Sequence, residues 1–111
     1  VGSENKSELT VGYFTKHGDS GADLLPIANL VKSQVRELAA YLGIPQKIIE
    51  KAPAAGLWSG QTDEQEMGLT YQELDQYILT GRINSPEKEA KIKAMHQKSE
   101  HKRQMPQIPD F

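Results

Sequence analysis

The segment from Gly12 to Asp23 carries residue types that bind polar ligands. It combines Lys16 with the aspartates Asp19 and Asp23, and with glycines that let the backbone approach a ligand closely. A lysine offers a point charge to a phosphate or a carboxylate. An aspartate accepts hydrogen bonds from ribose hydroxyls or an amide. An ordinary solvated loop, whose glycines provide positive φ, would have the same composition. The residues alone leave both interpretations open.

Glu8 is the candidate metal ligand of the chain. Carboxylate oxygens are hard donors that suit magnesium. Glu8 also stands three residues after Asn5, and this is the spacing of a capping box at the start of a helix. Both roles use the same carboxylate oxygens, so the sequence supports each of them and they compete.

Acidic residues gather in the middle of the chain without a base among them: Asp63, Glu64, Glu66, Glu73 and Asp75. Such a group could hold a cation or attract ammonium. The more common explanation is a solvated acidic face, and that is what we expect here.

Basic residues gather near the end of the chain, where Lys98, His101, Lys102 and Arg103 follow Lys88, Lys91 and Lys93. Lysine and arginine bind anions well, so this segment is a candidate for anion recognition. Acidic residues are interspersed in the same segment, and its charge would also serve simple solvation. Duplex nucleic acid is disfavoured, because neither the net charge nor aromatic interleaving supports it.

Composition removes several classes of function. The 111 residues include no cysteine, which excludes disulfides, thiolate metal sites and a cysteine nucleophile and fits a reducing compartment. His96 and His101 do not share a helical face and His17 is remote, so the histidines do not predict a metal site. The net charge is −2, and no apolar run approaches the roughly 20 residues that span a bilayer. We therefore expect no nucleic acid and no membrane as partners.

Capping residues and apolar spacing predict five short helices. They begin after Asn5, near Val31, at Pro45, after Thr70 and after Ser85, and the residues after Thr62 form a capped turn. The segment 31–42 has the clearest amphipathic spacing, with Gly43 as its stop. The last helix is polar and is expected to run to about Gln104.

The remaining segments are predicted to be loops. Residues 24–27 should be extended, because a residue that precedes proline avoids the helical region. Residues 53–60 are punctuated by proline and glycine, and the tail after Pro106 should be extended. The segment is therefore mainly α with loops, and such short helices do not easily close a core alone. The start at Val1 is interpreted as a cut inside a longer protein.

Ordered blocks of sequence carry a family resemblance. They are residues 2–8 (GSENKSE), 13–19 (YFTKHGD), 21–26 (GADLLP), 30–38 (LVKSQVREL), 53–58 (PAAGLW), 60–64 (GQTDE), 69–71 (LTY) and 100–103 (EHKR). Each block is weak, but the set in this order resembles the NAD synthetases and covers nearly the whole chain, residues 1–111. The resemblance identifies this chain as the C-terminal portion of such an enzyme.

The resemblance implies a parent α/β fold, Rossmann-like and of the adenine nucleotide hydrolase-like type, in a cytoplasmic homodimer. It also implies a ligase in which ATP and magnesium activate deamido-NAD through adenylation and ammonia then forms the amide. By family position Glu8 is the magnesium ligand. The ATP contacts fall on Ser3, Lys32 and Ala54, and the deamido-NAD contacts fall on Lys16, Asp23, His101 and Lys102. No protein nucleophile is needed, because the substrate carboxylate attacks.

Two departures from the family pattern stand out. The S-G-G-x-D-S loop, which cradles pyrophosphate and supplies another magnesium-binding aspartate, is absent from these residues. Ala54 occupies a position that usually holds threonine or serine. One hydroxyl hydrogen bond to ATP, worth about 0.5–1.5 kcal/mol, is therefore lost.

Three functions remain open on the sequence. The chain could be a segment of a working NAD synthetase, with the remainder in a longer protein. It could be a non-catalytic helical binding or dimerisation fragment of the same family. It could also be an unrelated interaction domain with a basic tail. The ordered blocks favour the first two, and the missing phosphate loop separates the first from the second.

Overall fold

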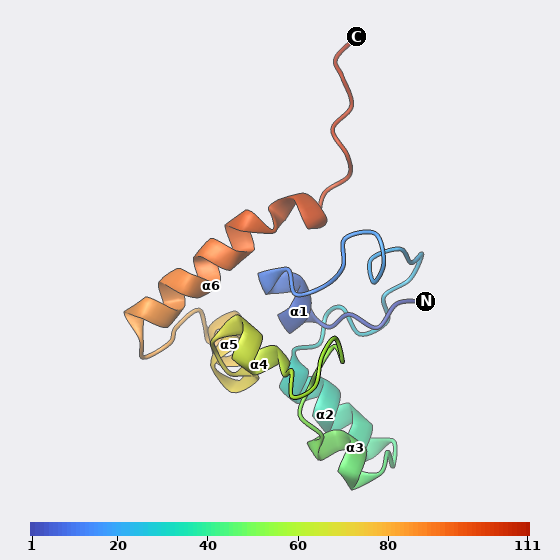
Figure 1. Cartoon of the computed structure of the whole chain (residues 1–111), viewed down its shortest axis with the longest axis vertical. Coiled ribbons are helices and arrows are strands. Elements are labelled where there is room, and N and C mark those ends of the chain that lie inside the picture. The colour runs from blue at the N-terminus through green and yellow to red at the C-terminus, as the bar shows by residue number, and fades with distance from the viewer.

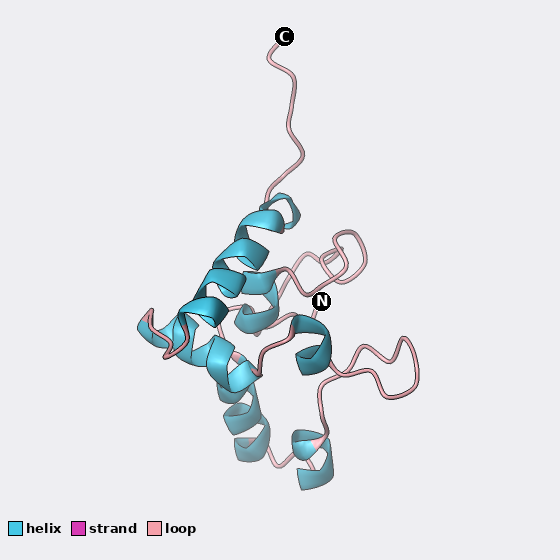
Figure 2. Cartoon of the chain, turned by 60° about the vertical axis from the view of Figure 1, so that its left-hand side comes forward, coloured by secondary structure: helices cyan, strands magenta, loops and turns pink.

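Six α-helices and one 3₁₀ turn make up the regular structure, and the computed structural model describes residues 1–111. In chain order they are α1 (Lys6–Val11), α2 (Lys32–Tyr41), α3 (Gln46–Glu50), α4 (Asp63–Met67), α5 (Tyr71–Thr80), α6 (Pro86–Lys98) and η1 (Glu100–Lys102). No strand is present (Figure 2). The prediction of a mainly helical segment with loops is confirmed. None of the helices has the length and apolar character that crossing a membrane requires.

Side-chain caps fix where the helices begin. At α1, the Asn5 side chain accepts a hydrogen bond from the Glu8 backbone N–H at 3.0 Å, and Glu8 Oε2 accepts from the Asn5 backbone N–H at 3.0 Å. This reciprocal pair is the predicted capping box. The hydroxyls of Thr62, Thr70 and Ser85 cap α4, α5 and α6, each by accepting a hydrogen bond from a backbone N–H three residues later. These starts are local features, which explains why the sequence predicted them.

Two predicted segments differ from the structure. Residues 24–27 are not extended throughout, because a turn begins at Leu25, whose carbonyl accepts from the Ala28 N–H at 3.2 Å. Pro26 occupies the second position of this turn, where its fixed φ is favourable. The last α-helix ends at Lys98 and not near Gln104. The Ser99 hydroxyl bonds back to the Met95 carbonyl at 2.7 Å, and the chain then tightens into η1.

The core lies where α1, α4, α5 and α6 meet (Figure 1). Its six buried members are Val11, Met67, Leu69, Tyr71, Leu74 and Ile92. Full burial of an apolar side chain contributes roughly 1.5–3 kcal/mol, so this cluster holds α1 against the two longer helices. Because Glu8 lies on α1, the core also fixes the position of this candidate metal ligand.

The apolar side of α2 does not join this core. No residue within α2 is buried, and Leu38 and Leu42 are 38% and 64% exposed. With α3, this side of α2 borders an open hollow of about 170 Å³ whose walls include Val35, Ile44 and Ile48. The helix predicted over 31–42 is confirmed, but its apolar face is covered only in part, by α3. The α2–α3 pair lies at the end of the molecule opposite the extended C-terminal tail (Figure 1).

Candidate functional site

An open cleft of about 420 Å³ lies beside α1. Three residues predicted for the ATP and magnesium sites, Ser3, Glu8 and Ala54, line it together. A second hollow of about 250 Å³ shares walls such as Phe14 and Leu57 with this cleft and extends to Lys102. The two hollows lie side by side, and we call them together the main cleft.

One wall of the main cleft is acidic. Glu4 and Asp63 line it and are only 6% and 5% exposed, yet Glu4 Oε2 and Asp63 Oδ1 are buried without a hydrogen-bond partner. The second oxygen of Asp63 accepts a hydrogen bond from the Tyr71 hydroxyl at 2.8 Å. Buried carboxylate oxygens without a partner are costly. This wall is suited to a positively charged or hydrogen-bond-donating ligand.

The expectation of a solvated acidic face is wrong for two of its five members. Asp63 lies in the wall just described, and Asp75 is also buried. Asp75 accepts hydrogen bonds from the Ser7 hydroxyl at 2.5 Å and from the Ser33 backbone N–H at 2.7 Å. These partners lie 68 and 42 residues away in the chain, and no local pattern indicates contacts of this kind. Glu4 was not singled out by the sequence for the same reason.

Glu8 is part of this acidic wall while it caps α1. Burial raises the pKa of its carboxyl above the usual value, and the charges of Asp63 and Glu4 add to the effect. The hydrogen bond from Asn5 and the positive charge of Lys32 act in the opposite direction. The capping bond uses Oε2, which leaves Oε1 for a ligand. No three acidic or histidine side chains lie close enough to hold a metal ion by themselves, so Glu8 can supply only part of such a site.

A hydrogen-bonded network that includes Tyr13 holds another part of the cleft wall. The Tyr13 hydroxyl donates to Glu66, and Gln61 Nε2 donates to Glu66 at 2.7 Å and to the Tyr13 hydroxyl at 3.1 Å. Gln61 Oε1 also accepts from the Leu57 backbone N–H at 2.9 Å. These bonds attach the loop over residues 53–61 to the segment after α1. The hydrogen bonds from Tyr13 and Gln61 hold the pKa of Glu66 below its usual value, so its charge persists at neutral pH.

Three residues predicted for deamido-NAD lie together, and one of them, Lys102, lines the second hollow of the main cleft. Lys16 Nζ lies 3.0 Å from His101 Nδ1, although the two residues are 85 positions apart. Lys102 Nζ donates to the carbonyls of Gly12 and Phe14 at 2.8 Å each and lies over the Phe14 ring. The structure thus brings Lys16, His101 and Lys102 together. We call this group the basic end of the cleft.

Three other cations of the C-terminal segment are paired with acids. Lys88 bonds Glu73 at 2.5 Å, Lys93 bonds Glu89 at 3.2 Å, and Arg103 bonds Glu100 at 2.8 Å. Lys88, Lys93 and Arg103 therefore use their charge in the fold, whereas Lys102 lines the second hollow of the cleft.

Lys32 and Asp23 lie apart from these groups. Lys32 Nζ lies 5.4 Å from the centre of the Tyr71 ring, and the residue borders the α2–α3 hollow rather than the main cleft. Asp23 is exposed and lines neither hollow of the cleft. Its neighbour Leu24 accepts a hydrogen bond from the Gly2 N–H at 2.9 Å, so Asp23 lies beside the segment that carries Ser3.

Comparison with known proteins finds relatives along nearly the whole chain. The family model described as NAD synthase matches residues 1–106. An NH(3)-dependent NAD(+) synthetase from Carboxydothermus hydrogenoformans is 57% identical over 109 residues, which are 98% of this chain and 44% of that protein. One from Archaeoglobus fulgidus is 54% identical over 111 residues, which are 97% of this chain and 45% of that protein. The chain therefore spans less than half the length of the curated relatives it matches.

Solved structures of similar proteins have the same arrangement. A structure of NMN synthetase from Francisella tularensis superposes with a TM-score of 0.92 at 52% identity, over 99% of this chain and 46% of that chain. An NH3-dependent NAD synthetase from Campylobacter jejuni superposes with a TM-score of 0.67 at 32% identity, over 98% of this chain and 44% of that chain.

Proposed function

The chain belongs to the NAD synthase family, and from this premise we propose that it forms the C-terminal part of a longer ligase that amidates deamido-NAD to NAD. The observation that carries the proposal is the main cleft. Its walls include Ser3, Glu8 and Ala54, and Lys102 lines its second hollow beside the contact between Lys16 and His101. These are the positions that the family resemblance assigns to ATP, magnesium and the dinucleotide.

The proposed reaction has two steps. The nicotinate carboxylate of deamido-NAD attacks the α-phosphorus of ATP, and pyrophosphate leaves. Ammonia then attacks the acyl carbon and loses a proton, and AMP leaves as the amide forms. Negative charge grows on the phosphates in the first step, where each well-placed donor is worth about two orders of magnitude in rate. No side chain of this chain needs to form a covalent bond.

Different parts of the cleft support different contacts. Ser3 offers a hydroxyl to ATP, whereas Ala54 has none, so any contact from Ala54 uses its backbone. Lys16, His101, Lys102 and Asp23 are proposed to bind deamido-NAD. Lys32 is proposed to bind ATP, and to reach it the side chain must leave the Tyr71 ring that it covers. Its charge already acts on the carboxyl of Glu8.

Magnesium fits the donor set at Glu8. The carboxylate oxygens that line the cleft are hard ligands, and two of them, on Glu4 and Asp63, are buried without a partner. We propose that Glu8 supplies one ligand and that the others come from nucleotide phosphates, water and residues outside this chain. When bound, magnesium neutralises charge on the phosphates.

The larger assembly is inferred from the family. We propose that the complete enzyme has the Rossmann-like α/β fold named above, contains the phosphate loop that these residues lack, and works as a homodimer in the cytoplasm. The exposed apolar side of α2 is consistent with further packing in that enzyme. The alternative of a non-catalytic fragment has less support, because the curated relatives are named as synthetases.

A second substrate deserves a parallel test. The superposition is tighter on the structure named NMN synthetase, with a TM-score of 0.92 against 0.67 for the Campylobacter NAD synthetase. We therefore include deamido-NMN, the mononucleotide form of the substrate, as the second candidate.

The test compares the complete enzyme with the isolated chain. Each is incubated with ATP, magnesium and ammonium, and with deamido-NAD or deamido-NMN, and the amide product is measured by chromatography. We expect the complete enzyme to amidate deamido-NAD, and the isolated 111 residues to amidate neither compound, because they lack the phosphate loop. Turnover by the isolated chain, or none by the complete enzyme on either compound, would contradict the proposal.

A further inference from the structure

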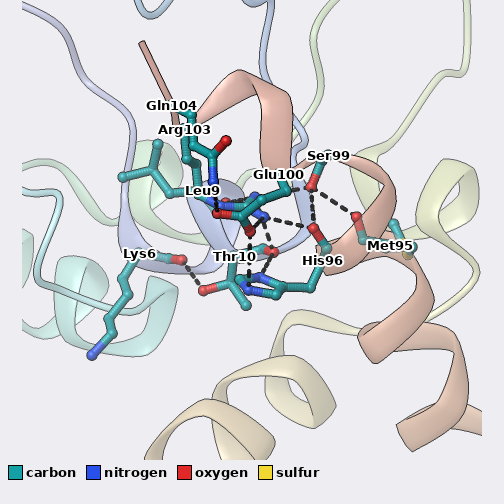
Figure 3. Close-up of polar contacts among 9 residues, drawn as sticks. All are labelled: Lys6, Leu9, Thr10, Met95, His96, Ser99, Glu100, Arg103 and Gln104. Carbon is teal, nitrogen blue, oxygen red and sulfur yellow. Dashed lines mark hydrogen bonds and ion pairs between the residues drawn. The ribbon is translucent and has the colours of Figure 1, made fainter. Parts of the chain in front are cut away.

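Arg103 joins the two helices that carry the site. Its Nη1 donates to the Leu9 carbonyl at 2.8 Å and to the Ser99 hydroxyl at 2.9 Å, and its Nη2 donates to the His96 carbonyl at 2.6 Å (Figure 3). Nη2 also bonds Glu100 Oε2 at 2.8 Å. The side chain is only 18% exposed. One guanidinium therefore bridges α1 and the end of α6.

The carbonyls that Arg103 binds are those a helix leaves free. Leu9 lies in the last turn of α1 and His96 in the last turn of α6, where backbone carbonyls have no partner within the helix. A positive charge is also favoured at the C-terminal end of a helix. The planar fork of arginine makes these four bonds with four terminal N–H groups in fixed directions, whereas the ammonium of lysine has only three donors. The arrangement therefore requires arginine specifically.

The residues around Arg103 strengthen the same junction. His96 Nδ1 lies 2.7 Å from the Thr10 carbonyl, beside the Leu9 carbonyl that Arg103 binds (Figure 3). Ser99 is packed directly on Gly12, since a Cβ added at Gly12 would lie 2.1 Å from the Ser99 Cβ. The short segment between Ser99 and Arg103 is thus fixed at both ends. That segment consists of Glu100, His101 and Lys102.

We propose that Arg103 is a positioning residue for the dinucleotide site, acting through His101 and Lys102. It holds η1 so that Lys102 reaches the Gly12 and Phe14 carbonyls and His101 reaches Lys16. Arg103 itself faces helix ends and is not a contact of the substrate. The inference rests on the proposed function, because it assigns Arg103 to the deamido-NAD end of the cleft and not to the ATP end.

Kinetics of the complete enzyme separate this role from general stabilisation. For Arg103→Ala and Arg103→Lys we expect KM for deamido-NAD to rise roughly tenfold to a hundredfold, since small displacements of positioning groups have effects of that size. KM for ATP should stay within twofold. Arg103→Lys keeps the charge but loses the fork, so it should recover little. Two controls are Arg82→Ala, an exposed arginine with no side-chain bond, and Ile92→Val, which weakens the core under α6.

Failure of the positioning role can be distinguished from failure of the proposed function. Absence of amidation by the unmodified enzyme counts against the proposed function, whereas the positioning role is judged from the variants. Equal rises of both KM values, the same pattern in Ile92→Val, or full recovery in Arg103→Lys would overturn it. Amide hydrogen exchange of the complete enzyme gives a readout that needs no turnover. Arg103→Ala should expose the amides of residues 12–16 and 100–102, and unchanged exchange there would also overturn the proposal.

Discussion

Glu8 caps α1 with the same carboxylate that we propose as the magnesium ligand. It closes the capping box of α1 through its bond with Asn5, and it contributes to the acidic wall with Glu4 and Asp63. Burial raises the pKa of this carboxyl because the charged form is poorly solvated there. A charged group held in such a place lowers stability and is typical of a functional site.

Gly12 lies where the C-terminal segment packs closely against the end of α1. It has a φ of 73° at the end of α1, and Ser99 fills the space that a side chain would need. Gly43 has a similar φ of 77° after α2 but has nothing within 4 Å of an added Cβ. Alanine at either position strains the backbone by about 1–2 kcal/mol.

Chemical denaturation of the isolated chain can compare the two glycines. Gly12→Ala should lower the free energy of unfolding by roughly 1–3 kcal/mol more than Gly43→Ala, because it adds overpacking to the same backbone strain. Equal losses in the two variants would mean that Ser99 does not pack against Gly12 in solution.

Among single residues, the sequence predicted those contacts that join residues close together in the chain. The caps at Asn5 and Thr70 depend on residues three apart, and both are present. The burial of Asp63 and the bonds of Gln61 with Tyr13 depend on contacts that the chain makes only once it has folded. The prediction from the run of acidic residues therefore overestimated how many of them are exposed to solvent.

The helices are joined by a few specific contacts in addition to the core. Lys88 of α6 bonds Glu73 of α5 at 2.5 Å, and Asp75 of α5 binds Ser7 of α1 and the first turn of α2. α5 is thus the central element to which the others attach. The hydrogen bond from Lys88 is the main cause that holds the pKa of Glu73 below its usual value.

The lowered pKa of Glu73 determines how the stabilisation by the Lys88–Glu73 pair depends on pH. Because the folded-state pKa of Glu73 is lowered, the pair stabilises the fold above the unfolded-state pKa of about 4.3. This stabilisation is lost as the pH falls through the lower folded-state value. Both side chains are partly exposed, so Lys88→Met should lower the free energy of unfolding at pH 7 by only about 0.2–1 kcal/mol.

Denaturation at several pH values checks this prediction. The difference between Lys88→Met and the unmodified chain should shrink toward zero as the pH falls below the lowered folded-state pKa of Glu73, because the carboxyl is then protonated. Lys91→Met, on the same helix and without an ion pair, is the control. A loss in Lys88→Met that stays constant with pH would show that the side chain acts by packing alone.

Element ends were predicted less well than element starts. The start of α6 follows from Ser85 and Pro86, whereas its end depends on the bond from the Ser99 hydroxyl to Met95 and on contacts with α1. The proline at the start of α6 was interpreted correctly. At Pro26 the prediction was wrong, because the turn from Leu25 to Ala28 outweighs the preference of Leu25 for an extended conformation.

The whole molecule has a small core and an apolar side in solvent. Only 16 of its 111 residues are buried, so its stability rests on few contacts. The amphipathic pattern over 31–42 predicted a helix, and the helix is there, but the pattern could not tell which chain segment would cover it.

Two leucines distinguish the core from the apolar side of α2. In the isolated chain, Leu42→Lys should change the free energy of unfolding by less than about 0.5 kcal/mol, because Leu42 is 64% exposed. Leu74→Ala should cost about 2–5 kcal/mol, because Leu74 is fully buried. Thermal unfolding followed by circular dichroism measures both. A large loss in Leu42→Lys would mean that this side of α2 is packed in the isolated chain.

The most direct test of the account is the dependence of amidation on Glu8 in the complete enzyme. Glu8→Gln keeps an acceptor for the Asn5 N–H, since glutamine also closes a capping box, but it removes the charge from the acidic wall. Glu87→Gln is the matched control, an exposed glutamate in the first turn of α6. The measurement is the rate of NAD formation from deamido-NAD, ATP, magnesium and ammonium. We predict a loss of about two orders of magnitude or more in Glu8→Gln and less than a twofold change in Glu87→Gln. Full activity in a folded Glu8→Gln enzyme would contradict the assignment of the main cleft as the site of adenylation.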